Sequence, residues 1–263
     1  MTNKPSRTWT SKQAWKCSLV LIALSIGTNG WYRAVLHFYP TARQWYWSPA
    51  GLTFNALLQP TLWLAAVMWF ARPRSLRDFL RDAGLIAKPK LSGWLAACAG
   101  LGIGFLMLYW GRKHPGPPNS NYRLLYQSGE LVWFIEITRR VVLVPVYEEL
   151  TMRGFLYRAF RTTYGQTVST FLVLCVDGYF HRDAISHSLF WPAWWIAGGV
   201  ILCQLRERTT TTWNCVLFHA AANAALFLRW QASVLGVILL FPYCARTTDD
   251  ASPANAKGES RAV

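Results

Sequence analysis

The sequence predicts an all-α, polytopic membrane protein in which about eight transmembrane helices enclose a polar cavity. Hydrophobic residues make up 53% of the 263 residues and charged residues only 15%, whereas a soluble domain carries about 25% charge. The apolar residues also cluster into blocks, several of which approach the roughly 20 residues that a helix needs to cross a bilayer. The basic residues gather in the gaps between these blocks, as expected of loops that control membrane topology.

The apolar blocks define eight candidate spans along the chain. The fifth and eighth spans are short. Each could be a tilted, a buried or a partly re-entrant helix. Almost nothing separates the last two, so they form a tight hairpin or one of them is not a span. The candidate spans are about 14–36, 52–71, 91–111, 131–157, 166–181, 188–205, 211–230 and 232–245.

The spans form a single transmembrane domain at 14–245, between a basic tail at 1–13 and a polar tail at 246–263 that we expect to be disordered. With eight spans, both termini lie on the same side as the most basic loop, and that side is the cytoplasm. We therefore expect an integral, multi-pass protein of the bacterial inner (plasma) membrane. The basic residues of that loop are Arg72, Arg74, Arg77, Arg81, Lys88 and Lys90.

The net charge is strongly positive, with 27 Lys and Arg against 12 Asp and Glu and a formal charge of +15. In a soluble protein this excess would suggest nucleic acid as a partner. Here topology control and anionic lipid headgroups account for it. We expect the lipid bilayer as a partner and no nucleic acid.

Span four contains the most costly polar residues. An ionisable side chain at mid-bilayer costs about 2.5–3.5 kcal/mol or more and marks function by default. The adjacent Glu148 and Glu149 point about 100° apart around a helix, and Arg153, four residues after Glu149, is placed for an ion pair with it. Glu148 then lacks a basic partner in its own helix and is available as a general base. Pro145 lacks an N–H and predicts a kink. The alternative is that both glutamates form interhelical salt bridges without chemistry.

Two other pairs of polar residues are also spaced four apart. His219 and Asn223 share one face of span seven, where three intervening alanines allow another helix to approach closely. Such a pair could donate hydrogen bonds to a developing oxyanion, or it could form ordinary interhelical hydrogen bonds. Glu136 precedes Arg140 in span four, and a structural ion pair is expected there.

Span five ends in a histidine close to the membrane surface. His181 could polarise a water held by Glu148 or bind a metal, and Asp177, four residues earlier, could fix its tautomer by a hydrogen bond. The alternatives are that His181 is an interfacial residue in a solvated loop, or that His187 takes its place.

These motifs resemble those of the CAAX prenyl endopeptidase and bacteriocin-processing (CPBP/Abi) family of intramembrane glutamate or metallo proteases. The sequence EELTMRGFLY at 148–157 matches the E-E-x-x-x-R motif and its usual flank. His219 and Asn223 match the H-x-x-x-N motif. The second family motif, an aromatic residue followed four positions later by histidine, is matched only by His181, because Asp177 occupies the aromatic position.

The resemblance covers about residues 131–230 and implies an eight-span core with a catalytic cavity open to the cytoplasm. It implies that Glu148 activates a water with help from His181. It further implies that His219 and Asn223 stabilise the tetrahedral oxyanion.

The resemblance also implies that Glu149 and Arg153 hold the site together, and we expect Asp177 to support it. Members of the family have been described both as metalloproteases and as metal-free glutamate proteases, so the cofactor is either none or a divalent metal such as zinc. Its ligands would be one carboxylate and two imidazoles, from Glu148, His181 and His219.

The function that these features favour is hydrolysis of a peptide bond in a membrane-embedded or membrane-associated protein or peptide. One alternative is a non-catalytic immunity or scaffold protein of the same family. The other is a transporter that uses Glu148 and Glu149 as a proton or cation site, although no inverted repeat supports it. The sequence does not imply a prenylated substrate.

Overall fold

The computed structural model describes residues 9–39, 41–86, 89, 91–113, 129–182, 190–209, 211–228 and 230–249. All regular secondary structure in these segments is helical. The predicted all-α class is therefore confirmed for the described part of the chain. The Pro-rich loop at 114–121 and His187 lie outside the described residues.

Three long apolar helices make up most of the N-terminal half. Thr10 and Gln13 form a capping box that starts the first helix, and Ser48 caps the third, with Pro49 at its first position. These three helices, α1, α3 and α5, are long and apolar enough to cross a membrane. The helices of this half are α1 (Ser11–Phe38), α2 (Ala42–Tyr46), α3 (Pro49–Ala71), α4 (Leu76–Asp82) and α5 (Leu91–Lys113).

The central helix contains two π-helical segments, one on each side of the Glu148–Glu149 pair. Its five parts follow one another without a break: α7 (Glu130–Thr138), η1 (Arg139–Leu143), α8 (Val144–Glu149), η2 (Leu150–Leu156) and α9 (Tyr157–Arg161). Such segments are rare and often found at functional sites.

Pro145 lies two positions after the end of the first π segment. The amide of Val144 donates to the carbonyl of Arg139, five residues earlier, which is the π register. In that register residue 145 would donate to the carbonyl of Arg140, but proline has no N–H. The kink at Pro145 stays a prediction, and what the structure shows beside this proline is a π segment.

Four helices complete the fold. They are α10 (Gln166–Phe180), α12 (Phe190–Thr209), α13 (Trp213–Phe227) and α14 (Trp230–Asp249). Both of the last two candidate spans are helices: α13 ends at Phe227 and α14 begins at Trp230. Helix α14 continues to Asp249, into the segment predicted as a disordered tail, because the helix extends beyond the apolar residues that set the predicted boundary.

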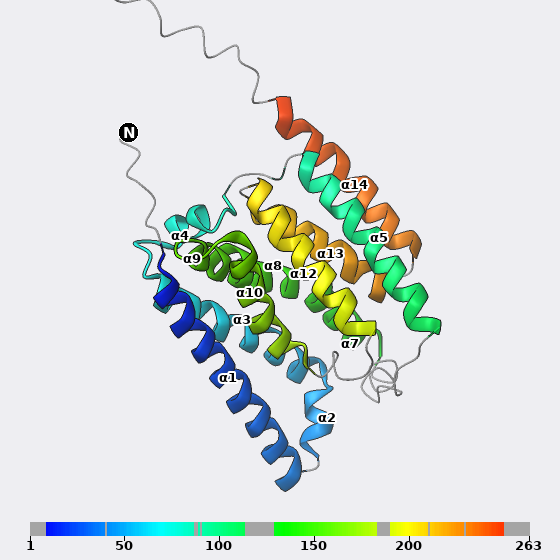
Figure 1. The fold of residues 1–263 in the computed structure, drawn as a ribbon. Coiled ribbons are helices and arrows are strands. Elements are labelled where there is room, and N and C mark those ends of the chain that lie inside the picture. Colours follow the sequence, from blue (N-terminus) through cyan, green and yellow to red (C-terminus); the bar gives the residue numbers. More distant parts are fainter. Residues whose placement is uncertain are drawn as a thin grey trace, which may run out of the picture.

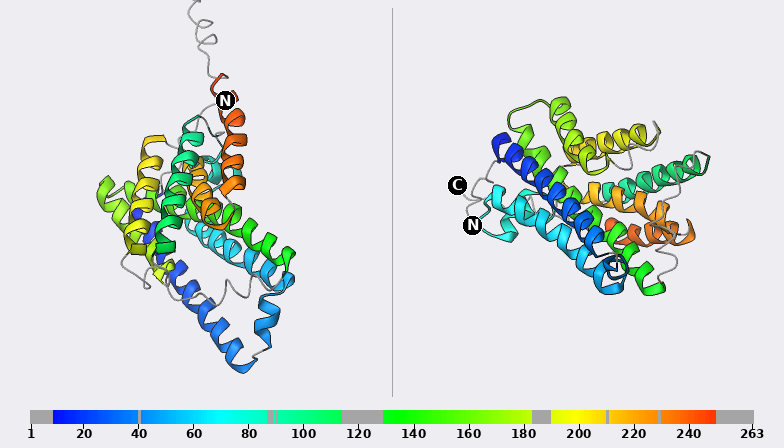
Figure 2. Two further views of the ribbon diagram at one scale, coloured as in Figure 1. Left: turned by 90° about the vertical axis from the view of Figure 1, so that its right-hand side faces the viewer. Right: turned by 90° about the horizontal axis from the view of Figure 1, so that it is seen from below.

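The helices are arranged around the central helix. Figure 1 shows α1 along one flank, α5 with α14 along the opposite flank, and α8, α9 and α10 between them, and Figure 2 shows the same order from below. The closest packing is between α5 and α13, where Gly100 and Gly104 lie against the backbone of Phe218 and Ala222. Small residues permit such close approach of membrane helices, and here they fix the position of His219.

Candidate active site

A buried arginine holds together two parts of the site. Arg153 in η2 is only 1% exposed. Its Nη1 lies 3.3 Å from Oε1 of Glu149, and its Nη2 lies 3.1 Å from Oδ2 of Asp177 on α10. The predicted Glu149–Arg153 pair is confirmed, and the bond to Asp177 extends it to a second helix.

Each of these two carboxylates also holds a histidine. Nδ1 of His219 on α13 lies 2.8 Å from Oε1 of Glu149. Nδ1 of His181 lies 3.3 Å from Oδ1 of Asp177 and 3.0 Å from its backbone oxygen. We call these five residues, with Arg153 at their centre, the Arg153 cluster.

The hydrogen bonds of the Arg153 cluster define the tautomers of both histidines. Carboxylate and carbonyl oxygens only accept hydrogen bonds, so Nδ1 carries the proton in His181 and in His219. The Nε2 atom of a neutral ring is then an acceptor, and that of a protonated ring is a donor. Each histidine therefore presents Nε2 for chemistry, and a carboxylate fixes its orientation, as second-shell groups commonly do.

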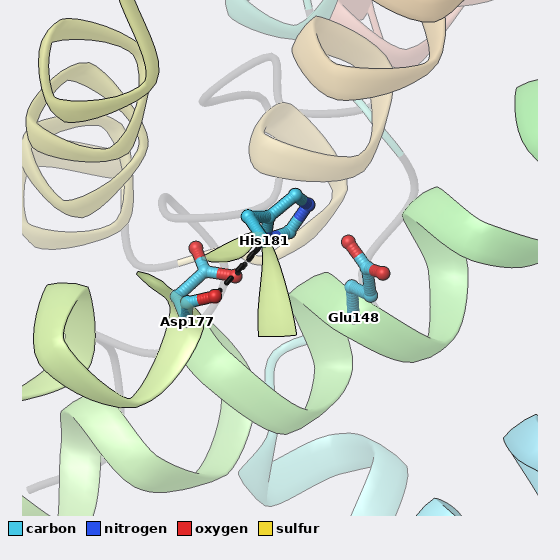
Figure 3. A group of neighbouring side chains, drawn as sticks. All are labelled: Glu148, Asp177 and His181. Carbon is cyan, nitrogen blue, oxygen red and sulfur yellow. Dashed lines mark hydrogen bonds and ion pairs between the residues drawn. The ribbon is translucent and has the colours of Figure 1, made fainter. Parts of the chain in front are cut away.

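Glu148 lies beside the Arg153 cluster, on the side of His181. Potential ligand atoms of Glu148, Asp177 and His181 all lie within 4.8 Å of one another. Figure 3 shows the His181 ring between the two carboxylates, bonded to Asp177, with its other nitrogen on the side of Glu148. The Glu148 side chain is buried, like that of Glu149, but the two neighbours have separate surroundings. Glu149 pairs with Arg153 and His219, whereas Glu148 faces His181.

Asn223 has a structural partner. Its Nδ2 donates to the backbone carbonyl of Arg140 over 2.8 Å, so this hydrogen bond joins α13 to η1. One N–H of the Asn223 amide is used in this way. The amide has a second N–H.

The cluster of Glu148, Asp177 and His181 fits a metal ion poorly. Asp177 already has one oxygen bonded to Arg153 and the other near Nδ1 of His181. A guanidinium next to that carboxylate also opposes the binding of a dication. His219, the third ligand predicted with Glu148 and His181, is bonded to Glu149 through Nδ1. Its Nε2 stays available, as in a metal-binding histidine that a carboxylate orients.

Sequence reasoning missed two features of this region. The Arg153–Asp177 ion pair joins residues from different helices, and the only signal for it was the acidic residue at a position where the family has an aromatic one. The predicted Glu136–Arg140 pair is confirmed, with 2.6 Å between Oε1 and Nε, but Glu136 also binds Arg139 through two hydrogen bonds of 2.7 Å.

The fold and the site define a class of protein: an all-helical, membrane-type chain with a buried glutamate–histidine–arginine site. Residues 130–225 match the family model described as Rce1-like, type II CAAX prenyl endopeptidase Rce1-like. The family predicted from the motifs is thereby confirmed for this segment. No curated protein and no solved structure is significantly similar to the chain.

Proposed function

We propose that the protein is an intramembrane endopeptidase that hydrolyses a peptide bond of a membrane-associated protein or peptide. The observation that carries this proposal is that the two adjacent glutamates have different partners. Glu149 is bonded to Arg153 and His219, whereas Glu148 faces Nε2 of His181. A carboxylate and an imidazole acceptor that face each other can bind and deprotonate one water between them.

In the proposed reaction, Glu148 removes a proton from this water while Nε2 of His181 accepts its other hydrogen bond. The hydroxide adds to the scissile carbonyl, and the new oxyanion accepts hydrogen bonds from Nε2–H of protonated His219 and from the second N–H of Asn223. The C–N bond then breaks, and Glu148 returns its proton to the leaving amine. Glu149, Asp177 and Arg153 keep both imidazoles in position.

We further propose that this reaction proceeds without a metal ion. Asp177 is committed to Arg153 and His181, so Glu148 and Nε2 of His181 remain as a water-binding pair. A zinc ion bound to Glu148, His181 and His219 would act as a Lewis acid instead.

The proposal includes a membrane arrangement. Residues 14–245 form one domain of eight spans with residues 131–230 as its catalytic core, and both termini lie in the cytoplasm of a bacterium, at its inner membrane. The three helices that are long and apolar enough to cross a bilayer support this arrangement.

The test is cleavage by protein purified in detergent and reconstituted in vesicles with a library of lipid-anchored peptides, followed by mass spectrometry. Glu148→Gln should abolish cleavage while the melting temperature stays within about 2 °C of the parent, because the change is isosteric. Glu207→Gln, at an ion pair remote from the site, should cleave normally. Retained cleavage by Glu148→Gln would sink the proposal. If the Glu148→Gln protein still complements the phenotype of a strain that lacks the gene, the result would instead indicate an immunity or scaffold role.

A further inference from the structure

A second polar site lies outside the Arg153 cluster. A cavity of about 360 Å³ opens between α1, α2, α3 and the start of the central helix. Its lining includes Glu136, Arg139, Arg140 and Trp63. None of the groups that we place in the reaction lines it.

The cavity collects the polar side chains from the apolar middle of two long helices. A polar group at this depth in a membrane is costly unless it faces protein or water. Helix α1 contributes Ser25, Thr28 and Asn29, which recur at the three- and four-residue spacing of one helical face, and α3 contributes Asn55 and Gln59 at the same spacing. All five line this one cavity, which indicates that it holds water or a polar ligand.

The charged groups among the described residues that line the cavity are two arginines and one glutamate. The Glu136 carboxylate is 3% exposed and accepts hydrogen bonds from both arginines. Arg139 and Arg140 are each partly open, with side-chain exposures of 24% and 32%. Two guanidinium groups against one carboxylate leave a preorganised cationic wall, and this wall favours an anion with a single negative charge.

One lining residue connects the cavity to the candidate active site. Trp63 packs against Tyr147, with 5.3 Å between ring centroids, and against Phe180, with 4.5 Å. These two aromatic residues directly precede Glu148 and His181 in the chain. The cavity and the reacting groups are thus separated by one layer of aromatic side chains.

We propose that this cavity binds a carboxylate group of the peptide substrate, either an acidic side chain or the carboxylate at the end of the chain. The inference rests on the proposed peptidase function. Glu148 lies nine positions after Arg139, or about 13 Å along a helix, a distance that about four residues of extended peptide would span. The bound carboxylate is thus about four residues from the scissile bond.

The test measures binding separately from cleavage. Alanine-rich octapeptides that carry a neutral BODIPY label are titrated into the Glu148→Gln protein in detergent, and fluorescence anisotropy is recorded. One peptide ends in a free carboxylate, one in an amide, and one in glutamate followed by an amide. We expect both carboxylate-bearing peptides to bind about tenfold or more tightly than the plain amide, as charge-assisted hydrogen bonds imply. If the peptide with the free terminal carboxylate and the peptide with the glutamate side chain bind equally, the site accepts a carboxylate from both sources. If only one of them binds tightly, the site is specific for that source of carboxylate.

Two matched variants separate the charge from the arginine itself. Arg139→Gln leaves Glu136 paired with Arg140 and removes the excess positive charge, so the preference for carboxylate should disappear. Glu136→Gln/Arg139→Gln loses the same arginine but keeps one positive charge, and the preference should return. A melting temperature and a gel-filtration profile like those of the parent show that each variant is folded.

Equal binding of all three peptides would overturn the proposal, as would an unchanged preference in Arg139→Gln. Competition by phosphatidylglycerol micelles with no discrimination among the peptides would overturn it in favour of a lipid headgroup. If the parent protein cleaves no peptide but the Glu148→Gln protein still prefers carboxylate-bearing peptides, the peptidase function is overturned and the carboxylate site is not.

Discussion

Replacement of Arg153 should destabilise the protein more than loss of any exposed ion pair, because Arg153 neutralises two buried carboxylates. Its guanidinium lies 3.3 Å from Glu149 and 3.1 Å from Asp177. At an effective dielectric constant of about 20, each contact is worth about 5 kcal/mol of Coulomb energy before desolvation is subtracted. Breaking a buried pair by removing one partner costs about 3–5 kcal/mol. Arg153→Met should therefore lower the melting temperature by about 6–20 °C, at about 2–4 °C per kcal/mol.

The assay is thermal unfolding of the purified protein in detergent, with Arg161→Met as the control. Arg161 pairs with Glu207 at 2.8 Å, but both side chains are about one-third exposed, and such pairs contribute at most about 1 kcal/mol. The triple variant Arg153→Met/Glu149→Gln/Asp177→Asn removes all three charges together. It should recover most of the lost stability while peptide cleavage remains absent, since neither histidine then has its carboxylate.

Two results would refute this reasoning. One is an Arg153→Met protein that is no less stable than Arg161→Met. The other is a triple variant that is less stable than Arg153→Met, which would mean that the guanidinium acts by packing and not by charge compensation.

Three other changes have defined outcomes. Treatment with a chelator followed by dialysis should leave the rate of peptide cleavage within about twofold of the untreated rate, because the proposed water activation uses no metal, and a loss that zinc restores would contradict this. Gly100→Ala should destabilise the protein by about 1–3 kcal/mol in thermal unfolding, because the added methyl group would overlap the backbone of Phe218. Gly102→Ala, which has nothing within 4 Å of the added methyl group, should be neutral or stabilise the protein by up to about 1 kcal/mol. Equal effects of the two changes would refute the α5–α13 packing. The hydrogen bond from Arg161 lowers the pKa of Glu207, at the polar end of α12, below its usual value of 4.5. Because the folded pKa is the lower one, the stabilisation is present above pH 4.5 and is lost as the pH falls through the folded pKa. The melting temperature should therefore fall more steeply with acid in the parent than in Glu207→Gln.

The features that depend on local spacing could be predicted from the sequence. The Glu149–Arg153 and Glu136–Arg140 pairs follow from residues four apart on one helix, and both are present. The all-helical class follows equally from apolar blocks whose lengths suit a bilayer. The close succession of α13 and α14 could be predicted because almost no polar residues separate the last two apolar blocks.

The features that depend on packing between helices could not be predicted in this way. No local pattern places Asp177 against Arg153, or His219 against Glu149, because each pair joins helices whose relative position the sequence does not state. Asn223 shows the same limit. Its partner is a backbone carbonyl of the central helix, and no local pattern indicates that α13 packs against that helix. The number of spans stays a prediction.

The polar cavity has a consequence for how the chain enters the membrane. The side chains that α1 and α3 direct to the cavity make these helices less apolar than α5, which contributes none. A translocon tests each segment for its own partition into lipid, and each polar residue near the centre makes that partition less favourable. Helix α5 is thus suited to insert alone, whereas α1 and α3 gain from insertion as a pair whose polar side chains line the same cavity. The same residues that line the cavity in the folded protein would thereby make the first helical hairpin the step of biogenesis most dependent on assistance.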